Sequence, residues 1–142
     1  MNRYCFEELE VGHEEKFSVT VTPDMLKKFQ EITGDVNPLH TDPLFAKKQG
    51  YTSCVAYGML TASFLSTLAG VYLPGEKSLI HSVETKFVKP VFPGDVLLVT
   101  GKVSEKNDLF HVLTVKVTIF NQNEEKVLRG TMQIGVMKDG EE

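Results

Sequence analysis

Hydrophobic and polar residues alternate with a period of two along much of the second half of the chain. Val115, Val117 and Ile119 fall on one side of the segment 109–120, with threonine and lysine on the other side. This alternation is typical of a strand with one buried face. Similar patterns, with turn-forming residues between them, predict further strands over residues 79–89, 96–104 and 126–137 and turns at 93–95, 106–108 and 121–124.

The first half of the chain opens with one predicted strand over residues 16–21 and then changes to a helical period. Thr22 can cap a helix that has Pro23 in its first position, and Gly34 supplies a natural end. We therefore expect a helix over residues 23–33.

A run of Asp-Val-Asn-Pro-Leu-His at residues 35–40 follows this helix. Pro38 has no amide hydrogen and favours extended geometry at Asn37, so the run is predicted to be a loop and not the interior of a helix. Asp42 and Pro43 then predict the start of a short helix that ends near residue 49. A loop held between two helices is well suited to fix side chains for binding or catalysis.

No charged residue occurs between Gln49 and Gly75, and the helical part of this segment runs from about Gly58 to Tyr72. That length falls short of the roughly 20 apolar residues that cross a membrane, so we expect a helix buried inside a soluble fold. One apolar helix followed by four antiparallel strands predicts a single α+β domain over residues 1–142. In this arrangement, the hot-dog fold, the sheet wraps around the helix.

Charge and composition narrow the function. The net charge of −4 argues against a nucleic-acid-binding protein, but it does not argue against an anionic thioester substrate. Cys5 and Cys54 do not have the spacing of metal ligands. The first ten residues carry acids and lack an apolar core, so we expect no secretory signal and a cytoplasmic location.

Asp35 and His40 are the candidates for acid–base chemistry, because a carboxylate and an imidazole around one water molecule can move protons. Gly58 opens the apolar helix, where backbone amides can bind a negative charge. The spacing alone leaves alternatives open. Asp35 can simply hydrogen-bond within the turn at Gly34, and His40 can be a structural loop histidine.

Three segments carry a resemblance to a known family. Residues 29–40, with Asp42, Pro43 and Ala46, resemble the signature of the MaoC-like (R)-specific enoyl-CoA hydratases. Residues 58–60 and 62–63 resemble the buried helix of that family, and residues 87–91 with 94–95 resemble its strand motif. The similarity extends over residues 20–100 and then weakens to a generic strand pattern.

The resemblance implies an enzyme that interconverts 2-enoyl thioesters and (R)-3-hydroxyacyl thioesters carried on coenzyme A or acyl carrier protein. It implies that Asp35 and His40 hold and activate the water, while Asn37 braces their loop. The Gly58 amide would face the thioester oxygen. The resemblance also implies a homodimer, and it implies no cofactor and no metal. It places further substrate contacts on the buried helix, at Met59 and Ser66.

Tyr57 departs from the family pattern, in which the residue before the helical glycine is commonly histidine. Because tyrosine is larger, we expect Tyr57 to line the pocket and to alter the acyl preference. Lys86 and Lys89 are candidate contacts for the phosphates of coenzyme A, although lysines on a strand are more often simply solvated. Cys54 has no recognisable base beside it and is expected to be a small packed residue.

Two other functions remain open. A hot-dog thioesterase would hydrolyse the same class of ester, but it would use a carboxylate on the buried helix, and residues 56–75 contain no acid. A non-catalytic subunit that binds acyl thioesters would not need Asp35, Asn37 and His40 together. The sequence does not distinguish coenzyme A from acyl carrier protein, and it does not fix the acyl chain or the direction of the reaction.

Overall fold

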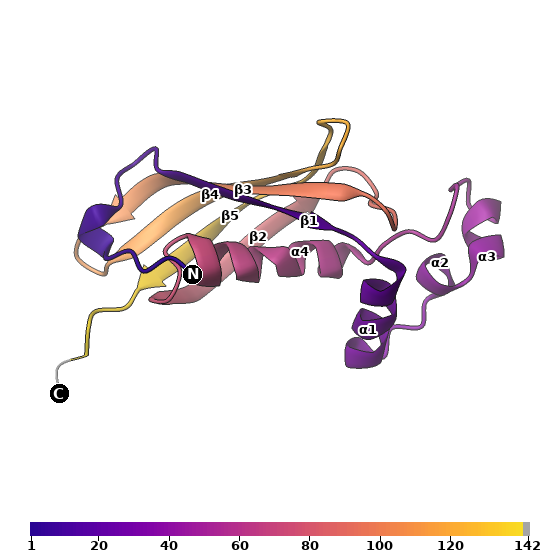
Figure 1. Ribbon diagram of the computed structural model, residues 1–142, viewed down its shortest axis with the longest axis horizontal. Coiled ribbons are helices and arrows are strands. Elements are labelled where there is room, and N and C mark those ends of the chain that lie inside the picture. The colour runs from indigo at the N-terminus through magenta and orange to yellow at the C-terminus, as the bar shows by residue number, and fades with distance from the viewer. Residues whose placement is uncertain (141–142) are drawn as a thin grey trace.

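The computed structural model describes residues 1–140 as a sheet, a helix that lies against it and three further helices at one end (Figure 1). The strands are β1 (Glu14–Thr20), β2 (Ser78–Phe87), β3 (Val96–Asn107), β4 (Val112–Phe120) and β5 (Lys126–Val136). The helices are α1 (Pro23–Thr33), α2 (Pro38–Thr41), α3 (Pro43–Lys48) and α4 (Gly58–Thr67). A 3₁₀ turn spans Phe6–Glu8, and a π-helical turn, Leu68–Tyr72, continues α4.

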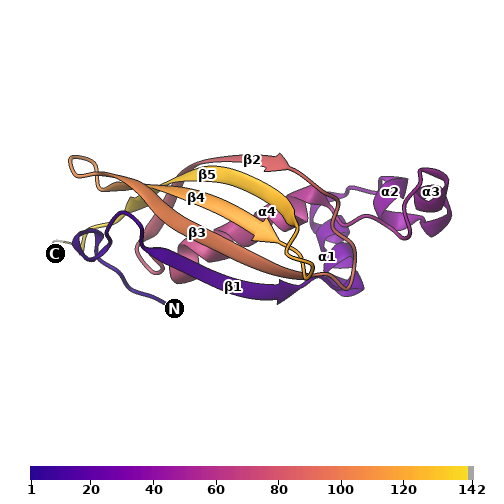
Figure 2. The same cartoon turned by 90° about the horizontal axis from the view of Figure 1, so that it is seen from above.

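The five strands form one antiparallel sheet in the order β1-β3-β4-β5-β2. α4 lies across one face of this sheet, and α1, α2 and α3 lie beyond its end (Figures 1 and 2). The predicted alternation is confirmed, since the sheet residues that face α4 form the core; they include Val99, Val103, Leu113, Val115, Val117, Ile119, Leu128 and Met132. The predicted hot-dog arrangement is therefore confirmed.

The turn between β3 and β4 was predicted two residues too early. β3 continues to Asn107, and the reversal uses residues 108–111. The side chain of Asn107 accepts hydrogen bonds from the amides of Leu109 and Phe110, at 3.1 Å each, and His111 takes a positive φ of 52°. A local side-chain bond thus places the turn where a large apolar pair, Leu109 and Phe110, is exposed.

The helix α1 begins and ends as predicted. The hydroxyl of Thr22 accepts the amide of Met25 at 3.1 Å, and Gly34 closes the helix with a left-handed φ of 73°. The segment 35–40 differs from the prediction, because Pro38 starts the one-turn helix α2, which contains His40. Pro38 fits in the first helical position, where no amide hydrogen is needed.

The helix α4 is apolar as predicted, but a single chain covers only part of its surface. Leu60, Thr61 and Leu65 are buried towards the sheet, whereas Met59, Ser63 and Ser66 form an exposed face. No helix within residues 1–140 is long and apolar enough to cross a membrane.

Gly101 allows the helical layer to approach the sheet closely. A Cβ atom at this position of β3 would lie 2.8 Å from Cδ2 of Leu68 and 3.2 Å from Cγ1 of Val115. Leu68 is fully buried where the π-helical turn continues α4. The small residue in the sheet therefore fixes how deeply α4 is seated.

Candidate active site

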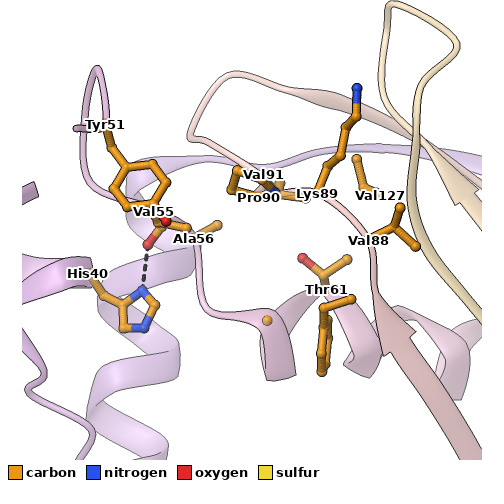
Figure 3. A pocket seen from close by; sticks show the side chains of 12 residues that line it. His40, Tyr51, Val55, Ala56, Thr61, Val88, Lys89, Pro90, Val91 and Val127 are labelled. Carbon is orange, nitrogen blue, oxygen red and sulfur yellow. Dashed lines mark hydrogen bonds between the residues drawn. The ribbon is translucent and has the colours of Figure 1, made fainter. Parts of the chain in front are cut away.

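A cavity of about 280 Å³ lies between the first turn of α4, the helix α2 and the segment that connects β2 to β3 (Figure 3). Most of its lining is apolar and comes from Val55, Ala56, Phe87, Val88, Pro90, Val91 and Val127. The remaining lining residues are His40, Tyr51, Gly58, Thr61 and Lys89. The cavity therefore combines a hydrophobic wall with a few polar groups, as small-molecule sites commonly do.

His40 reaches the cavity from α2 in a fixed orientation. Its Nδ1 lies 2.6 Å from the carbonyl oxygen of Val55, and its ring stacks on Tyr57 with 4.1 Å between the ring centroids. Since a carbonyl oxygen can only accept, Nδ1 carries the hydrogen and Nε2 of the neutral ring is left as a proton acceptor. This bond, drawn in Figure 3, prepares the imidazole to act as a base.

Asp35 lies on an exposed loop whose backbone is held on both sides. Its carbonyl oxygen accepts the hydroxyl of Tyr57 at 2.6 Å, and its amide donates to the hydroxyl of Thr33 at 3.2 Å. Oδ1 of its carboxylate accepts the amide of Asn37 at 3.0 Å. Asp35 does not line the cavity.

Asn37 caps the helix that follows this loop. Its side-chain oxygen accepts the amide of Leu39 at 2.9 Å and so caps α2, the helix that carries His40. A short chain of side-chain to backbone bonds therefore joins the Asp35 loop to the His40 helix.

Tyr57 is 2% exposed and does not line the cavity; its ring packs between Phe29 and His40. Burial raises the pKa of its hydroxyl, and the charge of Asp35 adds to the effect. The hydroxyl therefore keeps its hydrogen at neutral pH and can donate it. Through its ring and its hydroxyl, Tyr57 holds both His40 and the backbone of Asp35.

Gly58 starts α4 at the cavity. Tyr57 occupies the N-cap position, but its side chain makes no cap bond to the helix. The first amides of the helix are therefore available to a ligand that carries a negative charge. A side chain at position 58 would crowd the ring of Phe87, because a Cβ there would lie 3.1 Å from Cε1 of Phe87.

Of the remaining predicted residues, the structure brings only Lys89 to this cavity and leaves Met59, Ser66 and Lys86 outside it. Met59 is 66% exposed, and Ser66 lies on the same exposed face of α4. Lys86 pairs with Arg129 across β2 and β5, next to Phe87, so its side chain points away from α4. Lys89 does line the cavity, and its ammonium group forms an ion pair with Glu125.

Sequence reasoning missed Val55, Tyr51 and Thr61. The contribution of Val55 is a backbone carbonyl, which leaves no signal in the sequence. Thr61 could have been noticed, because a residue three positions after Gly58 shares its helix face. Within residues 1–140, no group of three or more His, Cys, Asp or Glu side chains is placed to hold a metal ion.

Comparisons with known proteins agree on one family. The family model described as "MaoC like domain" matches residues 8–125. The (R)-specific enoyl-CoA hydratase of Aeromonas caviae is 33% identical over 114 residues, which are 80% of this chain and 85% of that protein. The 3-hydroxybutyryl-CoA dehydratase of Methylorubrum extorquens is 36% identical over 100 residues, which are 70% of this chain and 64% of that protein.

A solved structure agrees as well. The unliganded R-hydratase from Pseudomonas aeruginosa superposes with a TM-score of 0.89 at 28% identity, covering 94% of this chain and 86% of that one.

The geometry predicts the tautomer of His40. At a pH where the ring is neutral, the hydrogen should reside on Nδ1, because Val55 offers only an acceptor. Two-bond ¹H–¹⁵N correlation spectra of the imidazole rings measure this directly, and His40→Gln assigns the signal. Finding the hydrogen on Nε2 would show that the bond to Val55 does not exist in solution.

Proposed function

The chain belongs to the MaoC-like domain family, and from that premise we propose that it interconverts 2-enoyl thioesters and (R)-3-hydroxyacyl thioesters. One observation carries the proposal. His40, with Nε2 free to accept a proton, and Gly58, with its uncapped helix amide, line the same apolar cavity. The relatives in Aeromonas caviae and Methylorubrum extorquens are named for this chemistry. We take residues 1–142 as one such domain.

His40 and Asp35 would activate the water. A water molecule between Nε2 of His40 and the carboxylate of Asp35 gives up one proton as its oxygen bonds to C3 of the enoyl group. The Asp35–His40 pair would hold that proton while the electron pair of the C2–C3 double bond moves towards the thioester, and the pair would then deliver the proton to C2. Overall, one water molecule is added across the double bond, and the reaction needs no oxidant or reductant.

Gly58 would stabilise the charge that develops in between. When water adds to C3, the thioester becomes an enolate and its oxygen gains negative charge. An amide hydrogen at the start of α4 is fixed in place before the reaction, and the helix dipole adds to its effect. An apolar wall around the same space strengthens this interaction by excluding water.

We propose coenzyme A as the carrier and the cytoplasm as the location. Both named relatives act on coenzyme A thioesters by their names. Among the residues that the structure describes, Lys89 is the lysine that lines the cavity, and it can exchange Glu125 for a phosphate of the carrier. Lys86, on the other face of β2, would reach only parts of the carrier outside the cavity. Met59 and Ser66 would meet the substrate only where it passes over the exposed face of α4.

We also propose that the chain forms a homodimer through β2. This strand is at the edge of the sheet, so its outer backbone groups are unpaired within the described chain. The strand and the residue after it expose several large apolar side chains, which are Leu79, Ile80, Val83, Phe87 and Val88. A second copy placed across this edge would cover Met59 on α4 and would supply hydrogen-bond partners for the outer backbone groups of β2, as two-fold assemblies commonly do.

The proposed homodimer predicts a particular mass in solution. In solution the mass should be twice the 15.9 kDa of one chain. Val83→Asp, which adds charge to the apolar edge, should shift the mass towards one chain, whereas Lys102→Asp on β3 should not. Light scattering behind size exclusion measures both. A wild-type mass of one chain at micromolar concentration, with full activity, would refute the dimer.

The second prediction concerns the catalytic pair. Asp35→Asn and His40→Ala should each lower kcat by about 10²- to 10⁴-fold, since acid–base groups contribute on that scale. The double variant should lose far less than the product of the two losses, because both groups act on one water. Chiral analysis should give the (R)-3-hydroxyacyl product. Asp108→Asn, in an exposed turn, is the control, and near-normal hydration by folded Asp35→Asn would refute the assignment.

The third prediction concerns Tyr57 as a positioning residue. Tyr57→Phe keeps the ring against His40 but removes the bond to the Asp35 carbonyl. A hydrogen bond of this kind is worth about 0.5–1.5 kcal/mol, so kcat should fall about 3- to 10-fold. KM should stay unchanged, because Tyr57 does not line the cavity. A change in KM alone would instead support a role for Tyr57 in acyl selection.

A further inference from the structure

Thr61 is the buried polar residue that neither the fold nor the catalytic pair explains. It is 3% exposed, and apart from Tyr57 it is the polar side chain that residues 1–140 bury in the core. Its hydroxyl forms no hydrogen bond with another described residue. Among the described residues, every side-chain oxygen or nitrogen that is fully enclosed has a hydrogen-bond partner. Since the Thr61 oxygen has no such partner, part of its surface must be accessible. The hydroxyl must therefore open into the cavity that Thr61 lines.

The position of Thr61 on α4 aims the hydroxyl at the start of the helix. Thr61 follows Gly58 by three residues, and both line the cavity. Side chains on a helix lean towards its N-terminus and cover the preceding turn. Figure 3 shows the oxygen of Thr61 directed into the cavity. The amide of Gly58 and the hydroxyl of Thr61 thus face one space.

A purely structural role does not account for this residue. Threonine within a helix commonly donates to the carbonyl four residues earlier, which here belongs to Tyr57. That carbonyl instead accepts the amides of Leu60 at 3.1 Å and Thr61 at 3.2 Å. Valine has the same shape, tolerates the same environment and would leave no hydroxyl without a partner. The free hydroxyl therefore points to a ligand.

We propose that Thr61 donates its hydroxyl hydrogen to the thioester oxygen of the substrate and forms, with the Gly58 amide, a two-donor oxyanion hole. This inference rests on the proposed function and extends it. The Thr61 proton stays on its oxygen throughout; only the hydrogen bond strengthens as the thioester oxygen gains charge. Thr61 is accordingly a catalytic residue that touches the reacting group.

Two donors suit the chemistry better than one. An enolate oxygen carries nearly a full negative charge in a cavity whose wall is mostly apolar. The loss of either donor should therefore raise the activation free energy strongly. Met59 has the next amide of the helix, but its side chain turns to the exposed face and it does not line the cavity. Within the described chain, Thr61 is then the lining residue on α4 able to supply a second hydrogen.

The test compares Thr61→Val, Thr61→Ser and the control Thr67→Val, which lies on the same helix but outside the cavity. Thr61→Val should lower kcat for hydration of a short 2-enoyl-CoA by about 10²- to 10³-fold, the loss seen when one oxyanion donor is removed. KM should change much less. Thr61→Ser should restore most of the rate, and Thr67→Val should resemble the wild type.

Thermal unfolding separates this role from a structural one. Because the hydroxyl has no partner in the protein, Thr61→Val should unfold at the wild-type temperature or above it. An unchanged kcat, an effect on KM alone, or a fall in unfolding temperature that Thr61→Ser does not reverse would each overturn the inference. Failure of the proposed function is distinct, because the wild type itself would then not hydrate the substrate.

Discussion

The buried ring of Tyr57 joins the three segments that make up the site. Its hydroxyl bonds to the Asp35 carbonyl, its ring stacks on His40, and its backbone begins α4. A tyrosine hydroxyl buried without a partner would be costly, so the bond to Asp35 is needed for the ring to be buried at all. Its side chain makes no cap bond to α4, so the first amides of the helix have no side-chain partner there. One buried residue therefore lies where the Asp35 loop, the His40 helix and the start of α4 meet.

The site combines rigid and exposed parts. His40 is fixed by the Val55 carbonyl and by stacking, and Gly58 and Thr61 belong to a helix seated against the sheet through Leu68 and Gly101. Asp35, in contrast, is exposed on a loop that extends beyond the end of the sheet (Figure 1). A carboxylate exposed to solvent interacts less strongly with a single water molecule than a buried one does. Covering this loop, by the substrate or by a second copy of the chain, would make the pair more effective.

The cavity also constrains the substrate. Its walls are built mainly from valines, Ala56, Pro90 and Phe87, so an acyl group bound there as proposed would meet mainly apolar surface. Phe87 packs closely against Gly58, so a side chain at position 58 would have to displace its ring. Phe87 also belongs to the exposed apolar edge of β2, so the proposed dimer would bury a residue that lines the cavity.

The sequence by itself determined the elements and the faces that they bury. Alternation in residues 112–120 set the buried side of β4, Thr22 and Gly34 set the ends of α1, and the run at residues 35–40 marked the candidate site. These features are local, because a period or a cap depends on neighbours within a few residues. Only the tertiary structure decided that Val55 orients His40, that Tyr57 turns to Asp35 and that Thr61 opens into the cavity. The first two contacts join residues that are 15 and 22 positions apart, and the third depends on which side chains line a cavity. Hydrophobic periodicity specifies that a face is buried, but it does not specify which atoms that face will contact.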